Sequence, residues 1–300
     1  MTVVNQDIIV PAAETDKKLQ TFLTSRFPIG YVRKLFRKNG LRVNGKRSKP
    51  EDLVRAGDRI RLYIPFENII RHADTPPSAP RFSVTYEDSK LLVINKPSGI
   101  AVHEGKHVLK RHSVIGVLER TYREQGVTPQ LVHRLDRDTS GVLLIAKDEV
   151  TARELEAIFA AGKEAQKEYL CLVAGRLQDN QARIDLALPG REGVPVRAIT
   201  RFKVLDRFAQ TTLARVNIET GRMHQIRLHF AAIGYPVVLD DQHGDFNFNK
   251  QFSKKYGLKR QFLHASRLEI KHGSKKHVWS APTPPDLQKV IDALRAEKPD

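Results

Sequence analysis

Apolar residues recur with two different periods along the chain. In segments 19–23 and 32–36 they return every three or four positions, which predicts two short amphipathic helices. Segment 59–64, "RIRLYI", alternates apolar and polar residues and predicts a strand. The Asn-Gly pair in "LRVNGKR" predicts a tight turn after another strand, so the first part of the chain reads as two helices and a small hairpin sheet.

Further along, short apolar runs predict strands and longer amphipathic stretches predict helices. The strand-like runs are "LLVINKP", "VLLIAK", "YLCLVAG", "RIDLAL" and "TTLARVNI", and the helix-like stretches are "DEVTARELEAIFAAG" and "GRMHQIRLHFAAIG". This pattern predicts an α+β fold with a mixed, mainly antiparallel sheet. We expect Cys171 and Met223 to lie in its core.

A proline-rich stretch separates the two parts. Residues 66–80, "FENIIRHADTPPSAP", contain three prolines and no sustained period, which is typical of a linker. We therefore expect a small module at 1–65 with its core at 15–65, a linker at 66–80, and a large domain at 81–300.

The charge of the chain is strongly positive and unevenly distributed. There are 51 Lys plus Arg against 34 Asp plus Glu, a formal net charge of +17, which favours a polyanionic partner such as nucleic acid or an anionic membrane. Residues 16–65 contain 14 basic and 4 acidic residues, so 14 − 4 = +10 of this excess lies in the small module. We expect its second helix and its turn to contact phosphates, through Arg33, Lys34, Arg37, Lys38, Lys46 and Arg47.

Other features concern the compartment. The amino-terminal residues lack the pattern of a secretion signal, and no stretch reaches the roughly 20 apolar residues of a membrane span. With Cys171 as its single cysteine, the chain has no internal disulfide. We expect a cytoplasmic protein that does not bind membranes.

Four polar segments interrupt the apolar framework of the large domain. They are "INKPSGIAVHEG" at 94–105, "HRLDRDTSG" at 133–141, "QKEYLCLVAG" at 166–175 and "ETGRMHQIRLH" at 219–229. Each taken alone also fits an ordinary turn, capped loop, strand or surface helix. The chain has no nucleotide-binding glycine loop, no hydrolase nucleophile motif and no paired cysteines, and the five-residue spacing of His224 and His229 disfavours a metal site. What remains is a carboxylate on a loop, with arginine and tyrosine available to meet it.

These segments, in this order, resemble the RluA-type family of pseudouridine synthases. The match also includes "LHASRLEI" and "APTPPDL", and the region "LDDQHGD" to "QFLHASRL" is most similar to the RluC branch. The segment "RKLFRKNGLRVNGKR" with "AGDRIRL" resembles the small RNA-binding module of a ribosomal small-subunit protein.

The resemblance implies the isomerisation of uridine to pseudouridine in RNA, without a cofactor or metal. It assigns the nucleophile to Asp136 rather than Asp138, and pairing with the catalytic carboxylate to Arg227. Tyr169 would stack on the base and assist the removal of the proton from carbon five. Arg134 would fill the space that the flipped nucleotide leaves. The weaker candidates for RNA contact are Lys96, Arg222 and His224.

Two positions depart from the family pattern. His243 stands where tyrosine is more common, and Ser98 where alanine is common; we expect both to lie outside the chemistry. We expect a monomer acting on large-subunit ribosomal RNA. The alternatives are the same chemistry on transfer RNA, and a non-catalytic RNA-binding or ribosome-assembly protein.

Overall fold

The computed structural model describes residues 6–27, 29–63, 82–105, 108–162, 164–190 and 193–297. Contacts divide the chain into two units, Met1–Pro80 and Arg81–Asp300. The predicted linker at 66–80 lies outside the described residues.

The first unit packs two helices against small strands. Its three-stranded antiparallel sheet has the order β1-β5-β3, and β2 pairs with β4. The predicted apolar positions of both helices are buried in one core, together with Ile60 and Leu62. The element bounds are β1 Gln6–Ile9, β2 Lys17–Lys18, α1 Leu19–Thr24, α2 Ile29–Arg37, β3 Leu41–Val43, β4 Leu53–Val54 and β5 Arg59–Leu62.

Two turns shape this unit. Asn39, which follows α2, has a left-handed conformation with a φ of 50°. Strand β3 pairs with β5, and its last residue, Val43, also forms an antiparallel bridge with Lys46 across the Asn-Gly turn, as the predicted tight turn requires. The arginines of β5, Arg59 and Arg61, both bind Asp7 of β1, so part of the local positive charge is neutralised within the sheet.

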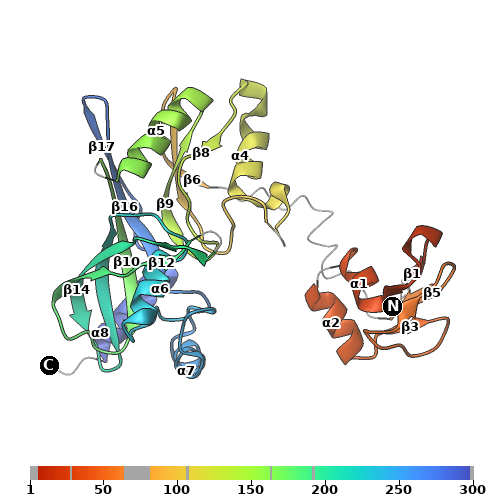
Figure 1. The fold of residues 1–300 in the computed structure, drawn as a ribbon. Helices are drawn as coiled ribbons and strands as arrows, with labels where there is room; N and C mark the ends of the chain where they lie inside the picture. Colours follow the sequence, from red (N-terminus) through yellow and green to blue (C-terminus); the bar gives the residue numbers. More distant parts are fainter. Residues whose placement is uncertain are drawn as a thin grey trace. The chain divides into compact units, whose positions relative to one another are not determined.

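The second unit is organised around a ten-stranded sheet within its described residues. The order is β11-β14-β15-β10-β16-β9-β7-β6, with β17 paired to β16 and β8 to β9 (Figure 1). All pairs are antiparallel except β16 with β9, which confirms the predicted mixed, mainly antiparallel sheet. The strand bounds are β6 Ser83–Glu87, β7 Leu91–Lys96, β8 Gln130–Leu131, β9 Ser140–Ala146, β10 Ala165–Ala174, β11 Gln181–Asp185, β14 Ile199–Arg207, β15 Thr211–Ile218, β16 Leu263–His272 and β17 Lys275–Ser280; β12 Leu188–Pro189 and β13 Pro195–Val196 form a separate pair.

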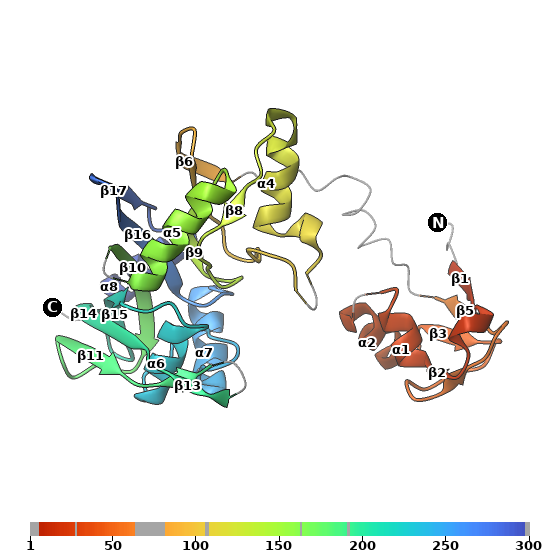
Figure 2. The same cartoon turned by 45° about the horizontal axis from the view of Figure 1, so that its top comes forward.

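Helices pack on this sheet and at its ends. Helix α5 contacts β9 and β16, whereas α6 and α7 lie next to each other in both views (Figures 1 and 2). The prediction for 149–161 is confirmed as α5. No helix in the described part of the chain is both long and apolar enough to cross a membrane. The helix bounds are α4 Val114–Tyr122, α5 Glu149–Ala161, α6 Gln225–Ala232, α7 Phe246–Tyr256 and α8 Pro285–Ala296.

The parallel junction between β9 and β16 fixes where the "HRLDRDTSG" loop ends. Gly141 of β9 lies opposite Ala265 of β16, and Ala265 lies opposite Tyr169 of β10. A Cβ at Gly141 would come within 2.1 Å of the Ala265 carbonyl oxygen, and the φ of Gly141 is +118°, so only glycine fits. Neighbouring strands are about 4.8 Å apart, which places Tyr169 about 10 Å across the sheet from the start of β9.

Candidate active site

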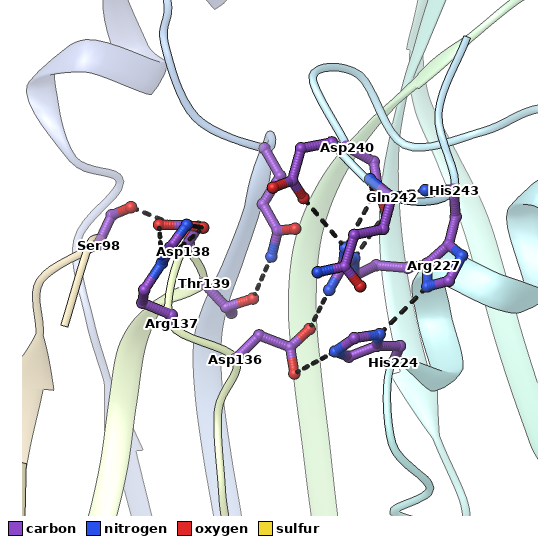
Figure 3. Close-up of polar contacts among 12 residues, drawn as sticks. Ser98, Asp136, Arg137, Asp138, Thr139, His224, Arg227, Asp240, Gln242 and His243 are labelled. Carbon is purple, nitrogen blue, oxygen red and sulfur yellow. Dashed lines mark hydrogen bonds and ion pairs between the residues drawn. The ribbon is translucent and has the colours of Figure 1, made fainter. Parts of the chain in front are cut away.

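The loop before β9 is held from two sides. The Thr139 amide donates to the Asp136 carbonyl at 3.2 Å, and the Thr139 hydroxyl accepts a 2.7 Å hydrogen bond from the Gln261 side-chain amide. From the other side, the Ser98 hydroxyl donates to the Asp138 carbonyl at 2.9 Å (Figure 3). Ser98 is therefore a support of this loop.

The two aspartates of the loop have different partners. The Asp138 carboxylate pairs with the adjacent Arg137 at 2.8 Å. The Asp136 carboxylate, 27% exposed, instead accepts a 3.1 Å hydrogen bond from Nη1 of Arg227, which lies on α6. Asp136 is thus the carboxylate that meets a buried arginine, while Asp138 binds within its own loop (Figure 3).

Arg227 connects two carboxylates. Its side chain is 4% exposed and binds Asp240 through two hydrogen bonds, from Nε at 2.6 Å and from Nη2 at 2.7 Å. Burial alone would raise the pKa of Asp240, but the hydrogen bonds from Arg227 and from two backbone amides outweigh burial and hold this pKa below its usual range. The two hydrogen bonds to Asp240 therefore fix the orientation of the guanidinium that binds Asp136, and the charge of Arg227 favours the ionised form of Asp240.

Lys96 is completely buried and does not face solvent. Its ammonium group donates to the carbonyl oxygens of Pro97, Ile100 and Arg137, at 2.9, 2.8 and 3.0 Å. Burial lowers its pKa to about 7, against the opposing charges of Asp138 and Asp136. The expectation that Lys96 contacts RNA is wrong, because its side chain is buried and its hydrogen bonds go to backbone carbonyls, two in the turn after β7 and one in the loop of Asp136.

Tyr169 lies on the buried face of β10 and is 7% exposed. Burial raises the pKa of its phenol, and the negative charge of Asp136 raises it further. Tyr169 is therefore a protonated, apolar platform close to Asp136. A phenol in this state suits base stacking better than proton removal.

Two histidines complete the surroundings of Asp136. The Nε2 atom of His224 is 3.9 Å from Oδ1 of Asp136, and its Nδ1 is 3.1 Å from Nε2 of His243. His243 therefore lies one contact away from Asp136, through His224. Met223, which precedes His224, was predicted to lie in the core but is 66% exposed. The reason is that α6 begins only at Gln225, so Met223 lies outside the helix.

The remaining predicted positions are on the surface. The Arg134 side chain is exposed and has no hydrogen bond or ion pair within the described ranges, and Arg222 is exposed with a hydrogen bond from Nε to the Arg197 carbonyl. The six residues predicted to contact phosphates in the small module all lie in the first unit, whereas Asp136 lies in the second. Lys34 is partly buried, and the other five are exposed, namely Arg33, Arg37, Lys38, Lys46 and Arg47.

Sequence reasoning missed the residues that hold the site together. Asp240 follows Leu239, which has a positive φ of 60°, and Asn249 of α7 binds the backbone of both residues. Gln261 reaches Thr139 from just before β16. The two adjacent aspartates in "LDDQHGD" indicate a charged loop, but the sequence does not indicate that Asp240 would bind Arg227. Among the described residues, no group of three or more His, Cys, Asp or Glu side chains is placed to hold a metal ion.

Comparison with known proteins identifies the class. The model of the RNA pseudouridylate synthase family matches residues 90–232, which include Asp136, Tyr169 and Arg227. The chain is 36% identical over 319 residues to ribosomal large subunit pseudouridine synthase C of Salmonella typhimurium, covering 97% of each protein. The chain belongs to the RNA pseudouridylate synthase family.

Further relatives agree with this assignment. The synthase C of Escherichia coli K12 is 36% identical, covering 96% of each chain, and that of Pasteurella multocida is 34% identical, covering 99% of this chain and 97% of the relative. The solved structure of human RNA pseudouridylate synthase domain containing 1 has a TM-score of 0.57 at 25% identity, and covers 74% of this chain and 98% of its own. The protein is thus an RNA pseudouridine synthase of the RluA type, and it is similar to the RluC branch.

Proposed function

We propose that this enzyme converts specific uridines of large-subunit ribosomal RNA to pseudouridine. The observation that carries the assignment is the partly exposed carboxylate of Asp136, held by the buried Arg227 and close to the buried Tyr169. The names of the relatives support ribosomal RNA of the large subunit as the substrate, since they span nearly the whole chain. We further propose that the enzyme is a cytoplasmic monomer.

Each residue has a distinct role in this proposal. Asp136 either attacks the anomeric carbon of the ribose or removes the proton from the neighbouring carbon. In the first route Asp136 forms a bond to the anomeric carbon as the bond from that carbon to N1 of uracil breaks; the base rotates, and its carbon five then displaces Asp136. In the second route the proton of the neighbouring carbon moves to Asp136 as the bond from the anomeric carbon to N1 breaks, and it returns when carbon five bonds to the anomeric carbon. In both routes the carbon-five proton passes to water, and N1 takes up a proton from water. Arg227 orients Asp136 through its hydrogen bond to the carboxylate, and Tyr169 stacks on the base. No oxidant, reductant or external energy source enters this balance.

The target base must leave its stack before Asp136 can reach the sugar. Unstacking costs a few kcal/mol and is least costly for a nucleotide in a loop or bulge. In this proposal Arg134, two residues from Asp136, occupies the vacated position, and the exposure of its side chain supports this role. Arg222 supplies a phosphate contact near the start of α6.

We propose that the first unit anchors the RNA. Its second helix and its Asn-Gly turn carry exposed cations over a well-formed core, which is the arrangement that phosphate contacts need. A module of this kind supports a large structured RNA over transfer RNA. The intact set of Asp136, Tyr169 and Arg227 supports an enzyme over a non-catalytic RNA-binding or ribosome-assembly protein.

The substrate is tested with transcripts carrying tritium at carbon five of uridine. Large-subunit ribosomal RNA, small-subunit ribosomal RNA and a pool of transfer RNAs are each incubated with the full chain. We expect tritium release from the large-subunit RNA alone. Release from transfer RNA alone would replace the proposed substrate, and RNA binding without release from any transcript would support the non-catalytic alternative.

A further inference from the structure

Two histidine rings lie in a row with the carboxylate of Asp136. His224 and His243 meet edge to face, with ring centroids 5.3 Å apart at 63°, and their Nδ1 and Nε2 atoms are 3.1 Å apart. The opposite nitrogen of His224, Nε2, faces Oδ1 of Asp136 at 3.9 Å (Figure 3). Arg227 binds Oδ2, so Oδ1 is the oxygen that it leaves free.

The contact between the rings requires one nitrogen to donate and the other to accept. If His224 donated through Nδ1, a neutral His224 ring would direct the lone pair of Nε2 at a carboxylate oxygen, which is repulsive. If His243 donates from Nε2, then Nδ1 of His224 accepts and its single proton lies on Nε2, directed at Asp136. The second arrangement is the favourable one.

Both histidines are fixed by their surroundings. The backbone amide of His243 donates to Oδ1 of Asp240 at 2.9 Å, the same carboxylate that holds Arg227. His224 has a φ of 50°, a left-handed conformation that is costly for a residue with a side chain. Burial lowers the pKa of His224, with Arg227 and His243 acting in the same direction against Asp136, so its ring is neutral near pH 7. A neutral ring has one proton, and its position then matters.

We propose that His243 is a positioning residue for the reaction, one that fixes His224 in the tautomer with its proton on Nε2. The N–H of His224 then points at the free oxygen of Asp136 and orients it without adding a charge to the site. This inference rests on the proposed role of Asp136. It makes the hydrogen bond between the rings, and not merely the volume of His243, a requirement for full turnover.

The tautomer is measured directly by ¹⁵N NMR of the full chain labelled at histidine. The His224 signals are assigned by their loss in His224→Gln. We expect wild-type His224 to carry its proton on Nε2. His243→Gln, which retains an amide donor, is expected to preserve this tautomer, and His243→Phe, which fills the space without a donor, is expected to lose it. A wild-type His224 with its proton on Nδ1 would overturn the proposal.

Single-turnover tritium release gives a second, independent result. His243→Phe should be slower by about tenfold, the worth of one hydrogen bond near a charge, with unchanged RNA affinity, and His243→Gln should recover most of the rate. Equal rates for the two variants would show that the donor is irrelevant and would overturn the proposal. If the wild type released no tritium from any RNA, the proposed function would fail, and the NMR result would still decide the tautomer.

Discussion

The guanidinium of Arg227 donates two hydrogen bonds, of 2.6 and 2.7 Å, to the carboxylate of Asp240, and its remaining nitrogen donates to Asp136. The Asp240 side chain is fully buried and Arg227 nearly so. We call this pair of hydrogen bonds to Asp240 the clamp. The clamp fixes the plane of the guanidinium, which the single 3.1 Å hydrogen bond to Asp136 would not fix. Asp240 thus sets the geometry of a reaction in which it does not take part.

Asp240→Asn should therefore impair both stability and turnover. It removes the charge that offsets the burial of Arg227, and we expect a loss of about 3 to 5 kcal/mol in the free energy of unfolding. Tritium release should fall about tenfold or more, because Arg227 is no longer oriented toward Asp136. Urea unfolding and single-turnover release measure the two effects.

The neighbouring Asp241 provides the matched control. Its side chain is 63% exposed and lies 3.5 Å from the same guanidinium. Asp241→Asn should change the stability by less than about 1 kcal/mol, as is usual for exposed ion pairs. Equal effects of the two substitutions would show that the clamp is not what positions Arg227.

Lys96→Met tests the buried anchor of the loop. The change preserves the length and most of the volume of the side chain but leaves three buried carbonyls without a donor. We expect a loss of about 3 kcal/mol in the free energy of unfolding, together with reduced turnover at unchanged RNA affinity. Lys254→Met, at an exposed position of α7, is the control and should have little effect. If Lys96→Met weakened RNA binding, Lys96 would contact RNA after all, and this account of its role would be wrong.

The stability of the protein should fall in mild acid because of His133. Burial lowers the pKa of this histidine to about 3, while Nε2 accepts a hydrogen bond from the Leu144 amide. Since the unfolded chain binds a proton near pH 6.5 and the folded chain does not, stability is full above pH 6.5 and declines as the pH falls toward 3.

His133→Gln retains an acceptor but does not titrate. Between pH 7 and pH 5 we expect the wild type to lose about 2 kcal/mol more than this variant in chemical unfolding. The comparison between the two proteins removes the contribution of the other histidines. If the free energy of unfolding changed with pH equally in the two proteins, the pKa of His133 would not be lowered by folding, which would contradict the prediction.

Neutralising Lys34, Arg37 and Lys38 tests the first unit as an RNA anchor. If each contacts a phosphate, the triple change to glutamine should weaken binding and reduce the slope of log K against log salt by about two. Glutamine substitutions at Lys254, Lys259 and Lys289, which are exposed on the second unit, are the control. An unchanged slope would mean that the helix cations are only a solvated surface.

The predictability of the site follows from the kind of contact that makes it. Asp136 and Arg227 lie in recognisable segments, and the parallel pairing of β9 with β16 brings the loop of Asp136 toward Tyr169. The hydrogen bonds between Asp240 and Arg227 were not predictable, because they depend on the left-handed conformation of Leu239, which the spacing of apolar residues does not indicate. Lys96 resembled a phosphate ligand because a cation at a turn is usually exposed.

The fold shows the same division. Periodic segments such as α5 and β9 were predicted, since their apolar faces are buried as the pattern requires. Met223 was misplaced because the pattern extends beyond the true start of α6, and the left-handed conformation of His224 interrupts it. Strand β1, which pairs with the predicted strand β5, is too short to show a clear period of its own.

The most direct test of the central claim compares Asp136→Asn with Asp138→Asn on large-subunit ribosomal RNA labelled with tritium at carbon five. Both variants keep the shape of the side chain, and Asp138 pairs only with the adjacent Arg137 in the described structure. We predict that Asp136→Asn binds RNA normally but releases no tritium, whereas Asp138→Asn releases it at a rate within a few-fold of the wild type. Normal release by Asp136→Asn would contradict the account.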